Sequence, residues 1–300
     1  MGERADRGLL EAMQRRATAT AGEFKPQDIA NMLWALAAMG ERADQAILSV
    51  LLDRFAARVL EFRDTLTSED KSQLHQWLLS CALDLEHGLS AEKNPVSAFV
   101  GSSKNLKEPG GALPRGVARV QRELGEECLL AFAGQGSHES QLQRHVANAL
   151  RGGWPEVEIE EEFRDVRSGY SIDVLVRRRS GSSRSGGTTN EASNGGRKVE
   201  EVPGVKWAVE VDGPTHYLGD ARTPSGSTLL KRKQLGQLGY TVVPVPFWEW
   251  DALGGEEAKL RRYLGDKLPT LRSEKTPTCS LVSSGGAGTP SCGLGGGLPE

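Results

Sequence analysis

The chain has 300 residues, of which 38% are hydrophobic and 26% charged, and its formal net charge is −3. This length suits one or two domains with a sizeable core. The near-neutral charge excludes a broadly basic nucleic-acid-binding protein without excluding a local basic patch. The four cysteines are scattered without metal-ligand spacing, which argues against a disulfide scaffold or a zinc site. No apolar run is long enough for a membrane span.

The first residues do not resemble a targeting signal. The segment from Met1 to Arg16 mixes Glu, Asp and Arg. It lacks the apolar stretch of a signal peptide and has too many acids for a transit peptide. We therefore expect either a cytosolic or nuclear protein or a fragment that lacks its leader.

Residues 1–87 contain an internal repeat. The segment MGERAD at Met1–Asp6 returns at Met39–Asp44, which gives a period of 38 residues. A period of this length, with two helices in each unit, predicts an α-solenoid. We expect Trp34 and Trp77, which lie on equivalent helices, in its core. Two repeats are too few for a stable solenoid, so we also expect that the array is truncated in this chain.

The rest of the chain divides into a linker, a second domain and a tail. Residues 88–116 are rich in Gly, Ser, Pro and Lys and are typical of a linker. Residues 117–268 form the second domain, interrupted at 179–198 by a Ser-, Gly- and Asn-rich insertion that we expect to be disordered. The Gly- and Ser-rich residues 269–300 predict a disordered tail.

Hydrophobic periodicity predicts the elements of the second domain as two helices, three strands, a helix, a strand and a short helix. The expected ranges are 117–132, 137–150, 157–163, 170–176, 206–212, 228–238, 240–246 and 256–264. Gly239 should end the helix before the last strand. The prolines of that last strand mark it as an edge strand. The predicted fold class is therefore α+β, a helical solenoid followed by an α/β domain.

The strand Trp207–Asp212 carries the most informative residues. Its alternation places the carboxylates of Glu210 and Asp212 on one face. Two carboxylates on one face repel each other, so we expect a cation, a metal or hydrogen-bond donors to offset them. If this strand pairs with the preceding one, Asp173 faces both of them. Three carboxylates can hold Mg²⁺ or Mn²⁺ through their oxygen atoms.

A basic run lies on the next helix. Lys231 shares a stripe with Leu235, which should pack on the sheet, so Lys231 starts near the strand ends. There it can offset the carboxylates or contact a phosphate. Arg232 and Lys233 add positive charge beside it, with a solvated helix face as the alternative reading. His216 follows the strand and can donate to a phosphate, act as a base or have a structural role.

Several separated motifs together resemble the RAP domain, which is named for RNA binding and abundance in apicomplexans. The motifs, within a similarity that spans about residues 137–264, are EVDGPTH at 210–216, LLKR at 229–232, LGY at 238–240 and FWEW at 247–250. The repeats are similar to octotricopeptide repeats and to the helices of FAST-kinase-like proteins. The resemblance implies RNA binding in a mitochondrion or chloroplast, in processing, stability or translation of transcripts.

The resemblance also implies a restriction-endonuclease-like α/β core. In that superfamily an acid on one strand and a Glu-x-Lys on the next hold a metal ion and the attacking water. Asp173 and Glu210 match the two acids. Asp212 occupies the lysine position, which departs from the pattern, and Lys231 on the following helix is then the candidate replacement.

Three functions stay open. The first, which we favour, is an organellar RNA-binding protein whose repeats bind single-stranded transcripts without a cofactor. The residues expected to contact RNA are His216, Lys231, Arg232 and Lys233. The second is a ribonuclease dependent on Mg²⁺. Its metal ligands would be Asp173, Glu210 and Asp212, with Lys231 as the fourth catalytic residue. The third is a non-catalytic scaffold whose helical repeats bind protein partners.

Overall fold

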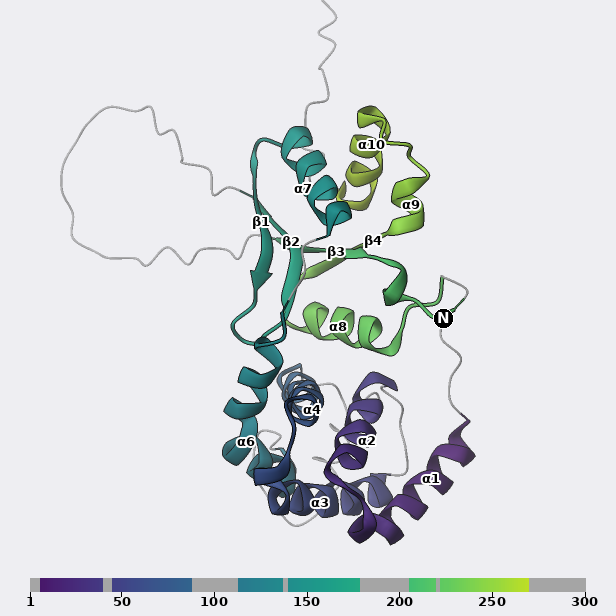
Figure 1. Ribbon diagram of the computed structural model, residues 1–300, viewed down its shortest axis with the longest axis vertical. Helices are drawn as coiled ribbons and strands as arrows, with labels where there is room; N and C mark the ends of the chain where they lie inside the picture. Colours follow the sequence, from purple (N-terminus) through teal and green to yellow (C-terminus); the bar gives the residue numbers. More distant parts are fainter. Residues whose placement is uncertain are drawn as a thin grey trace, which may run out of the picture.

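The computed structural model describes residues 6–39, 45–87, 113–136, 140–178, 205–219 and 222–269. Within these ranges the chain forms a helical unit, residues 7–133, and an α/β unit, residues 141–268, which sits directly on it (Figure 1). The predicted insertion at 179–198, most of the predicted linker and nearly all of the predicted tail lie outside the described residues. Each helix in the described part of the chain is too short or too polar to cross a membrane.

The helical unit is a stack of paired helices. Its elements are α1 (Arg7–Thr20), η1 (Ala21–Glu23), α2 (Pro26–Met39), α3 (Gln45–Glu61), η2 (Arg63–Thr65), α4 (Ser68–Glu86) and α6 (Arg115–Ala133). Helix α1 packs against α3 and α2 packs against α4, so equivalent helices of the two sequence repeats lie side by side. One core joins the helices, with Leu33, Phe55 and Leu74 fully buried in it. The α-solenoid itself stays a prediction.

Helix α6 belongs to this core by its packing. The sequence analysis placed residues 117–132 in the second domain, but Val120 and Leu124 are buried among the side chains of the helical unit. The helix contacts α3 and α4 along most of its length. Its amphipathic stripe was correctly recognised, whereas the surface that would cover this stripe could not be inferred from local periodicity.

Local hydrogen bonds explain where several helices begin. Asp6 Oδ1 accepts a hydrogen bond from the backbone N–H of Leu9 at 2.8 Å and caps α1. Thr67 and Asp70 form a reciprocal capping box at the start of α4. Pro26 occupies the first position of α2, where its missing N–H costs nothing. These caps satisfy backbone donors that have no partner within the helix.

The α/β unit is a four-stranded sheet with helices on both faces. Its elements are α7 (Gln141–Gly153), β1 (Val157–Arg164), β2 (Ser171–Arg178), β3 (Lys206–Asp212), η3 (Pro214–His216), α8 (Gly226–Gln237), β4 (Thr241–Pro246), α9 (Phe247–Asp251) and α10 (Glu257–Lys267). The strand order is β1-β2-β3-β4. The first three strands are antiparallel, and α8 crosses over to bring β4 parallel to β3.

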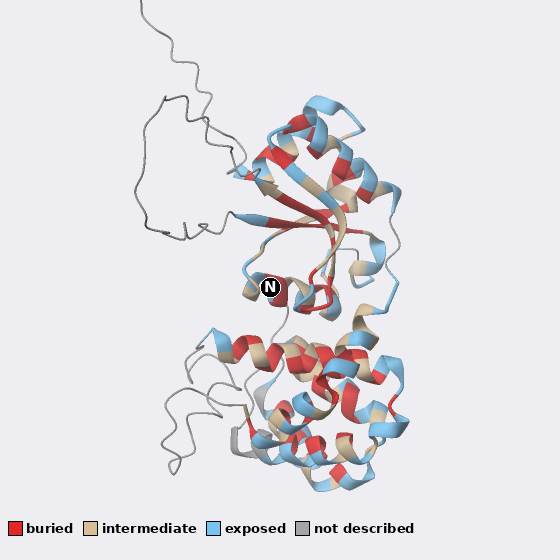
Figure 2. Cartoon of the chain, turned by 90° about the vertical axis from the view of Figure 1, so that its left-hand side faces the viewer, coloured by how far each residue is buried: buried red, intermediate tan, exposed pale blue. Residues whose placement is uncertain are grey.

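The two faces of the sheet are covered by different helices. Helices α7 and α10 pack on one face, against Trp207, Val209 and Val211 of β3. Helix α8 packs on the other face, where Leu235 contacts the side of the sheet that carries Ala208. Helix α8 therefore lies between the sheet and helices α2 and α4. Buried residues, red in Figure 2, run along the strands and along the helix faces that are turned toward them.

The sequence predictions for this unit agree closely with its elements. Every predicted strand is present with ends shifted by at most two residues, and the mixed helix-and-sheet composition confirms the α+β class. Gly239 adopts a φ of 92° just after α8, a conformation that glycine accepts without strain. Strand β4 lies at the edge of the sheet, as its prolines predicted. The nuclease-like core stays a prediction.

Candidate functional site at the strand ends

Strand β3 buries two carboxylates between the sheet and α8. Glu210 and Asp212 are each 2% exposed, and they alternate with residues that face the opposite core. The predicted alternation is therefore confirmed, and both carboxylates lie on the face that α8 covers. A buried carboxylate without a partner is strongly disfavoured, so the residues around these two acids decide what the site can do.

Lys231 of α8 pairs with Glu210. The Lys231 Nζ lies 2.5 Å from Glu210 Oε2, and the lysine side chain is 21% exposed. Burial raises the pKa of Glu210 to about 8, although the Lys231 ammonium opposes this rise. Burial also acts to lower the pKa of Lys231, but the Glu210 and Asp173 carboxylates outweigh it and hold that pKa above its usual value. The lysine therefore stays charged while Glu210 can exchange a proton near neutral pH.

Asp212 gathers three donors at the end of β3. Its Oδ2 accepts from Arg232 of α8 and from the Tyr217 hydroxyl at 3.3 Å. The Nδ1 of His216 lies 3.4 Å from Asp212 Oδ1, and the histidine is 40% exposed. Arg232 is 20% exposed. The tight turn after β3 therefore brings the side chains of His216 and Tyr217 back to Asp212, the last residue of the strand.

Asp173 lies close enough to Glu210 and Lys231 to influence their pKa values, and it is held by the backbone of β3. The β2–β3 ladder ends at Val174 and Val209, and beyond it Asp173 Oδ2 accepts a hydrogen bond from the Val211 N–H at 2.7 Å. Opposite Asp173 on β1, Glu162 has a φ of 51°, which interrupts the regular alternation. Burial raises the pKa of Asp173, opposed by the Lys231 ammonium and by the Val211 N–H.

Lys233 points toward the helical unit. Its Nζ lies 3.9 Å from Asp84 Oδ1 of α4, and the lysine side chain is 37% exposed. Each of the three consecutive cations Lys231, Arg232 and Lys233 therefore faces a carboxylate that is almost fully buried. Their contact with RNA phosphates stays a prediction, whereas their contacts with these carboxylates are part of the fold.

The residues present do not form a set of metal ligands. Among the described residues, no group of three or more His, Cys, Asp or Glu side chains is arranged to hold a metal ion. The oxygens of Glu210, Asp212 and Asp173 that face α8 or β3 are occupied by an ammonium, a guanidinium and a backbone N–H. Two buried atoms of the site, Glu210 Oε1 and Arg232 Nε, have no hydrogen-bond partner in the described part of the chain.

Comparison with known proteins identifies a domain family in this region. A family model described as "RAP domain" matches residues 209–267, the segment from the middle of β3 to the end of α10. The chain contains a RAP domain. The four motifs that carried the resemblance, from Glu210 to Trp250, lie inside the matched segment, whereas residues 137–208 of the expected similarity lie outside it.

The names of two similar proteins include an organelle. The chain is 40% identical over 63 residues to the RAP domain-containing protein, chloroplastic, of Oryza sativa subsp. japonica, over 20% of this chain. It is 36% identical over 81 residues to FAST kinase domain-containing protein 5, mitochondrial, of Macaca fascicularis, over 27% of this chain. Each match spans 10% of the relative's own length, so these similarities concern a short region of both relatives.

The RAP domain is joined to the helical unit by buried hydrogen bonds that sequence reasoning missed. Gln234 of α8 is fully buried and donates to the Gln76 carbonyl and to Ser80 Oγ, each at 2.7 Å. Its Oε1 accepts from the Tyr170 hydroxyl at 2.7 Å, which itself accepts from Gln76 Nε2 at 2.8 Å. The only local signal was a glutamine beside the apolar stripe of a helix. This network fixes the RAP domain on α4.

Proposed function

We propose that this protein binds single-stranded RNA in a mitochondrion or chloroplast and acts in the processing, stability or translation of organellar transcripts. The observation that carries the proposal is the RAP domain at residues 209–267. The names of the two relatives, one chloroplastic and one mitochondrial, support the compartment. RNA binding requires no cofactor in this proposal.

The electrostatics of the strand ends support a binding role over a catalytic one. Glu210 and Asp212 are paired with Lys231 and Arg232, so the buried acids do not present an uncompensated negative charge to an RNA phosphate. Each cation also has more N–H donors than its carboxylate uses. Lys233 is the most exposed of the three cations and is the best candidate for a phosphate contact.

Binding of a single-stranded RNA to the full chain tests this proposal. We expect fluorescence anisotropy to show an affinity that falls steeply between about 50 and 200 mM salt, because phosphate contacts release counterions. Lys233→Gln should weaken binding to all sequences and reduce the salt slope by about one. Lys259→Gln is the matched control, since Lys259 lies on α10 and its side chain is 56% exposed. An RNA affinity no higher than that of an unrelated acidic protein would overturn the proposal.

The ribonuclease alternative finds little support in the site. One oxygen of each carboxylate, Glu210 Oε2, Asp212 Oδ2 and Asp173 Oδ2, is engaged with Lys231, Arg232 or the Val211 N–H. The described residues do not form a ligand set for Mg²⁺. Incubation of RNA with the protein and Mg²⁺ decides between a ribonuclease and a binding protein. Cleavage that is lost in Glu210→Ala would establish the enzyme, and intact RNA would support the binding role.

An apolar groove in the helical unit favours the scaffold as a second candidate function. A cavity of about 390 Å³ lies along α1 and α2 and is lined by Leu10, Met13, Phe24 and Met32 among others. Met13 and Met39 at this groove are 53% and 45% exposed. Methionine-rich apolar surfaces adapt to protein partners. Crosslinking in cells that recovers proteins but no RNA would favour this function over RNA binding.

A further inference from the structure

A second cavity lies in the helical unit. Its lining residues come from α2, from α4 and from the end of α6 with Gln135 just after it. Its volume is about 480 Å³, within the usual range of pockets for small molecules. The cavity lining includes Asn31, Trp34, Glu69, Gln73, Phe132 and Gln135. This cavity is separate from the strand-end site and shares Asn31 and Ala35 of α2 with the apolar groove along α1 and α2.

The two aromatic walls are held in fixed orientations. Trp34 Nε1 donates to Gln76 Oε1 at 2.7 Å, which fixes the plane of the indole ring. The ring of Phe132 lies 5.0 Å from the rings of His75 and Tyr170, measured between centroids. The sequence analysis expected Trp34 in the core. The ring is instead only half-buried, and it lines the cavity.

Several polar groups in this cavity have no partner. The Oε1 of Gln73 is buried and accepts no hydrogen bond from any described residue. The Glu69 carboxylate and the Asn31 amide lie at the exposed rim. In the part of the chain that the structure describes, neither makes a side-chain hydrogen bond or ion pair. Since buried polar atoms are almost always paired, Gln73 Oε1 points to a ligand that carries a hydrogen-bond donor. The exposed Glu69 and Asn31 side chains are available to contact the same ligand.

The composition of the lining selects the chemistry of that ligand. No lysine, arginine or histidine is among the residues that line the cavity, so a phosphate or carboxylate group would find no counter-charge there. Aromatic rings with amide and carboxylate groups at their edge suit a flat, uncharged ring with hydrogen-bonding edges. Unpaired nucleobases have this chemistry.

We propose that the cavity binds one unpaired base of single-stranded RNA and favours guanine. The proposal rests on the RNA-binding function proposed above. Guanine carries the N1–H and the N2 amino group side by side, and a carboxylate such as Glu69 accepts from both at once. Trp34 provides a stacking surface, and Gln73 Oε1 is an additional acceptor. The phosphates on either side of the base would remain outside the cavity.

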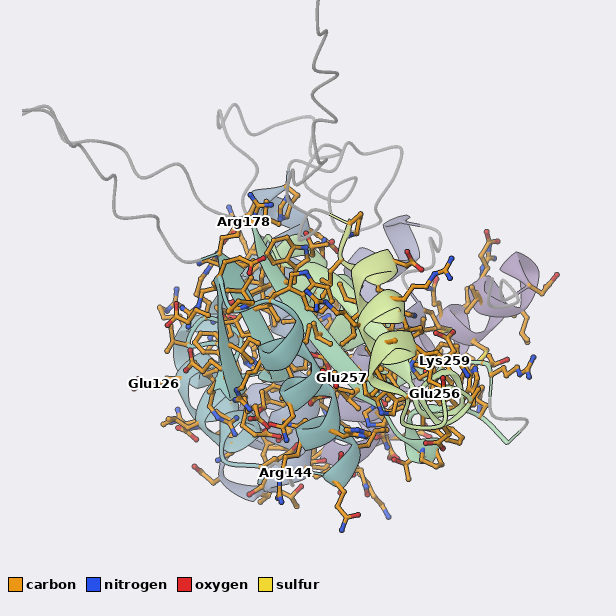
Figure 3. The ribbon with its side chains drawn as sticks, turned by 90° about the horizontal axis from the view of Figure 1, so that it is seen from above. Glu126, Arg144, Arg178, Glu256, Glu257 and Lys259 are labelled. Atoms are coloured by element: carbon orange, nitrogen blue, oxygen red, sulfur yellow. The ribbon has the colours of Figure 1, made fainter. Side chains whose placement is uncertain are left out.

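Replacement of guanine by inosine in the RNA tests this assignment, because inosine lacks only the N2 amino group. We expect the full chain to bind a guanine-containing single strand roughly tenfold more tightly than its inosine counterpart. In Glu69→Gln this ratio should fall close to one, with the guanine RNA bound more weakly than by the wild type. Glu126→Gln, which removes an exposed carboxylate at the rim of α6 (Figure 3), should keep the wild-type ratio.

The control separates recognition from simple electrostatics. Loss of a negative charge strengthens RNA binding in general, so a non-specific effect would make Glu69→Gln and Glu126→Gln bind slightly more tightly and alike. That result, or equal affinities of the wild type for guanine and inosine RNA, would overturn the guanine pocket while leaving RNA binding intact.

A titration with guanosine 5′-monophosphate keeps the pocket testable if RNA binding itself fails. The indole N–H signal of Trp34 is the one absent from the nuclear magnetic resonance spectrum of Trp34→Phe, and we expect it to shift with this nucleotide and less with cytidine 5′-monophosphate. A shift without any RNA binding would retain the base-binding cavity and reject the proposed function. No shift and no RNA binding would reject both.

Discussion

The strand-end site and the cavity of the helical unit are both polar, but they differ in how their polar groups are satisfied. At the strand ends, Glu210 and Asp212 are buried and each has a cation from α8. In the cavity, Gln73 Oε1 has no partner among the described residues, and Glu69 lies beside it at the rim. The first region pairs its charges within the fold, although Glu210 Oε1 has no partner among the described residues. The second region presents groups at an open cavity that a ligand can satisfy.

This difference separates residues that maintain the fold from residues that recognise a partner. The motif with the most conspicuous charge, from Glu210 to Arg232, uses its charges to attach α8 to the sheet. At the cavity, the side chains of Glu69 and Asn31 contribute little to the fold, because they make no side-chain hydrogen bond or ion pair among the described residues. Substitutions in the first region should therefore change stability, and substitutions in the second should change binding.

Loss of the buried lysine should have the largest effect on stability. Lys231→Met removes the partner of Glu210, and leaving one member of a buried pair costs about 3 kcal/mol. We expect this loss in the free energy of unfolding at pH 8 and a smaller loss at pH 5, where Glu210 takes up a proton and becomes neutral. Urea unfolding followed by circular dichroism measures it.

The control for this change is Lys259→Met. Lys259 lies 2.7 Å from Glu256, but both side chains are more than half exposed, and such surface pairs contribute at most about 0.5 kcal/mol. Equal losses for Lys231→Met and Lys259→Met would show that the strand-end pair is no more important than a surface pair, and the comparison between the two regions would lose its basis.

Removal of the buried glutamine between the two units should have the next largest effect. Gln234→Leu leaves the Tyr170 hydroxyl and the Gln76 carbonyl without their partner, and an unsatisfied buried group costs about 2 kcal/mol. We expect a matching fall in the free energy of unfolding. The exposed Gln121 of α6 gives the control Gln121→Leu, which should change stability little. Wild-type stability in Gln234→Leu would mean that the units do not depend on this network.

The pH dependence of stability should reveal the buried carboxylate. The pKa of Glu210 is raised to about 8 by burial, so the folded state holds a proton that the unfolded chain releases near pH 4.5. This group's contribution to stability is therefore complete below about pH 4.5 and is lost as the pH rises toward 8. Between pH 5 and pH 8 the loss is expected to be about 1 kcal/mol or more.

Glu210→Gln should remove this dependence. Unfolding of the variant and of the wild type at pH 5 and pH 8 measures the difference, and the variant should gain relative stability at the higher pH. Glu126→Gln, which removes an exposed carboxylate, should leave the wild-type dependence unchanged. A variant that loses stability in parallel with the wild type would show that Glu210 is ionised throughout this range.

Local patterns in the sequence were sufficient to predict much of the α/β unit. The alternation of β3 places Glu210 and Asp212 on one face because side chains of a strand alternate by geometry. The helical spacing of Lys231 and Leu235 correctly brought the lysine to the strand ends. Gly239 marked the end of α8 because only glycine adopts its positive φ freely.

Contacts between distant segments could not be predicted in this way. The hydrogen bond from Gln234 to the Gln76 carbonyl joins residues that are 158 positions apart, and no local period reports such a pair. The hydrogen bond that Asp173 accepts from the Val211 N–H, just beyond the end of the β2–β3 pairing, was likewise not indicated by local alternation. The packing of α6 on the helical unit was missed for the same reason.

The substitution with the smallest expected effect on stability tests whether residues at the cavity serve binding and not the fold. Asn31→Ala removes an exposed amide at the rim of the cavity. Alanine has the higher helix propensity, so the free energy of unfolding should stay within about 0.5 kcal/mol of the wild type. In the same preparation, binding of the guanine-containing RNA should weaken severalfold, because an exposed amide that does not stabilise the fold is free to contact a base. A variant that lost stability without losing affinity would place Asn31 with the residues that maintain the fold.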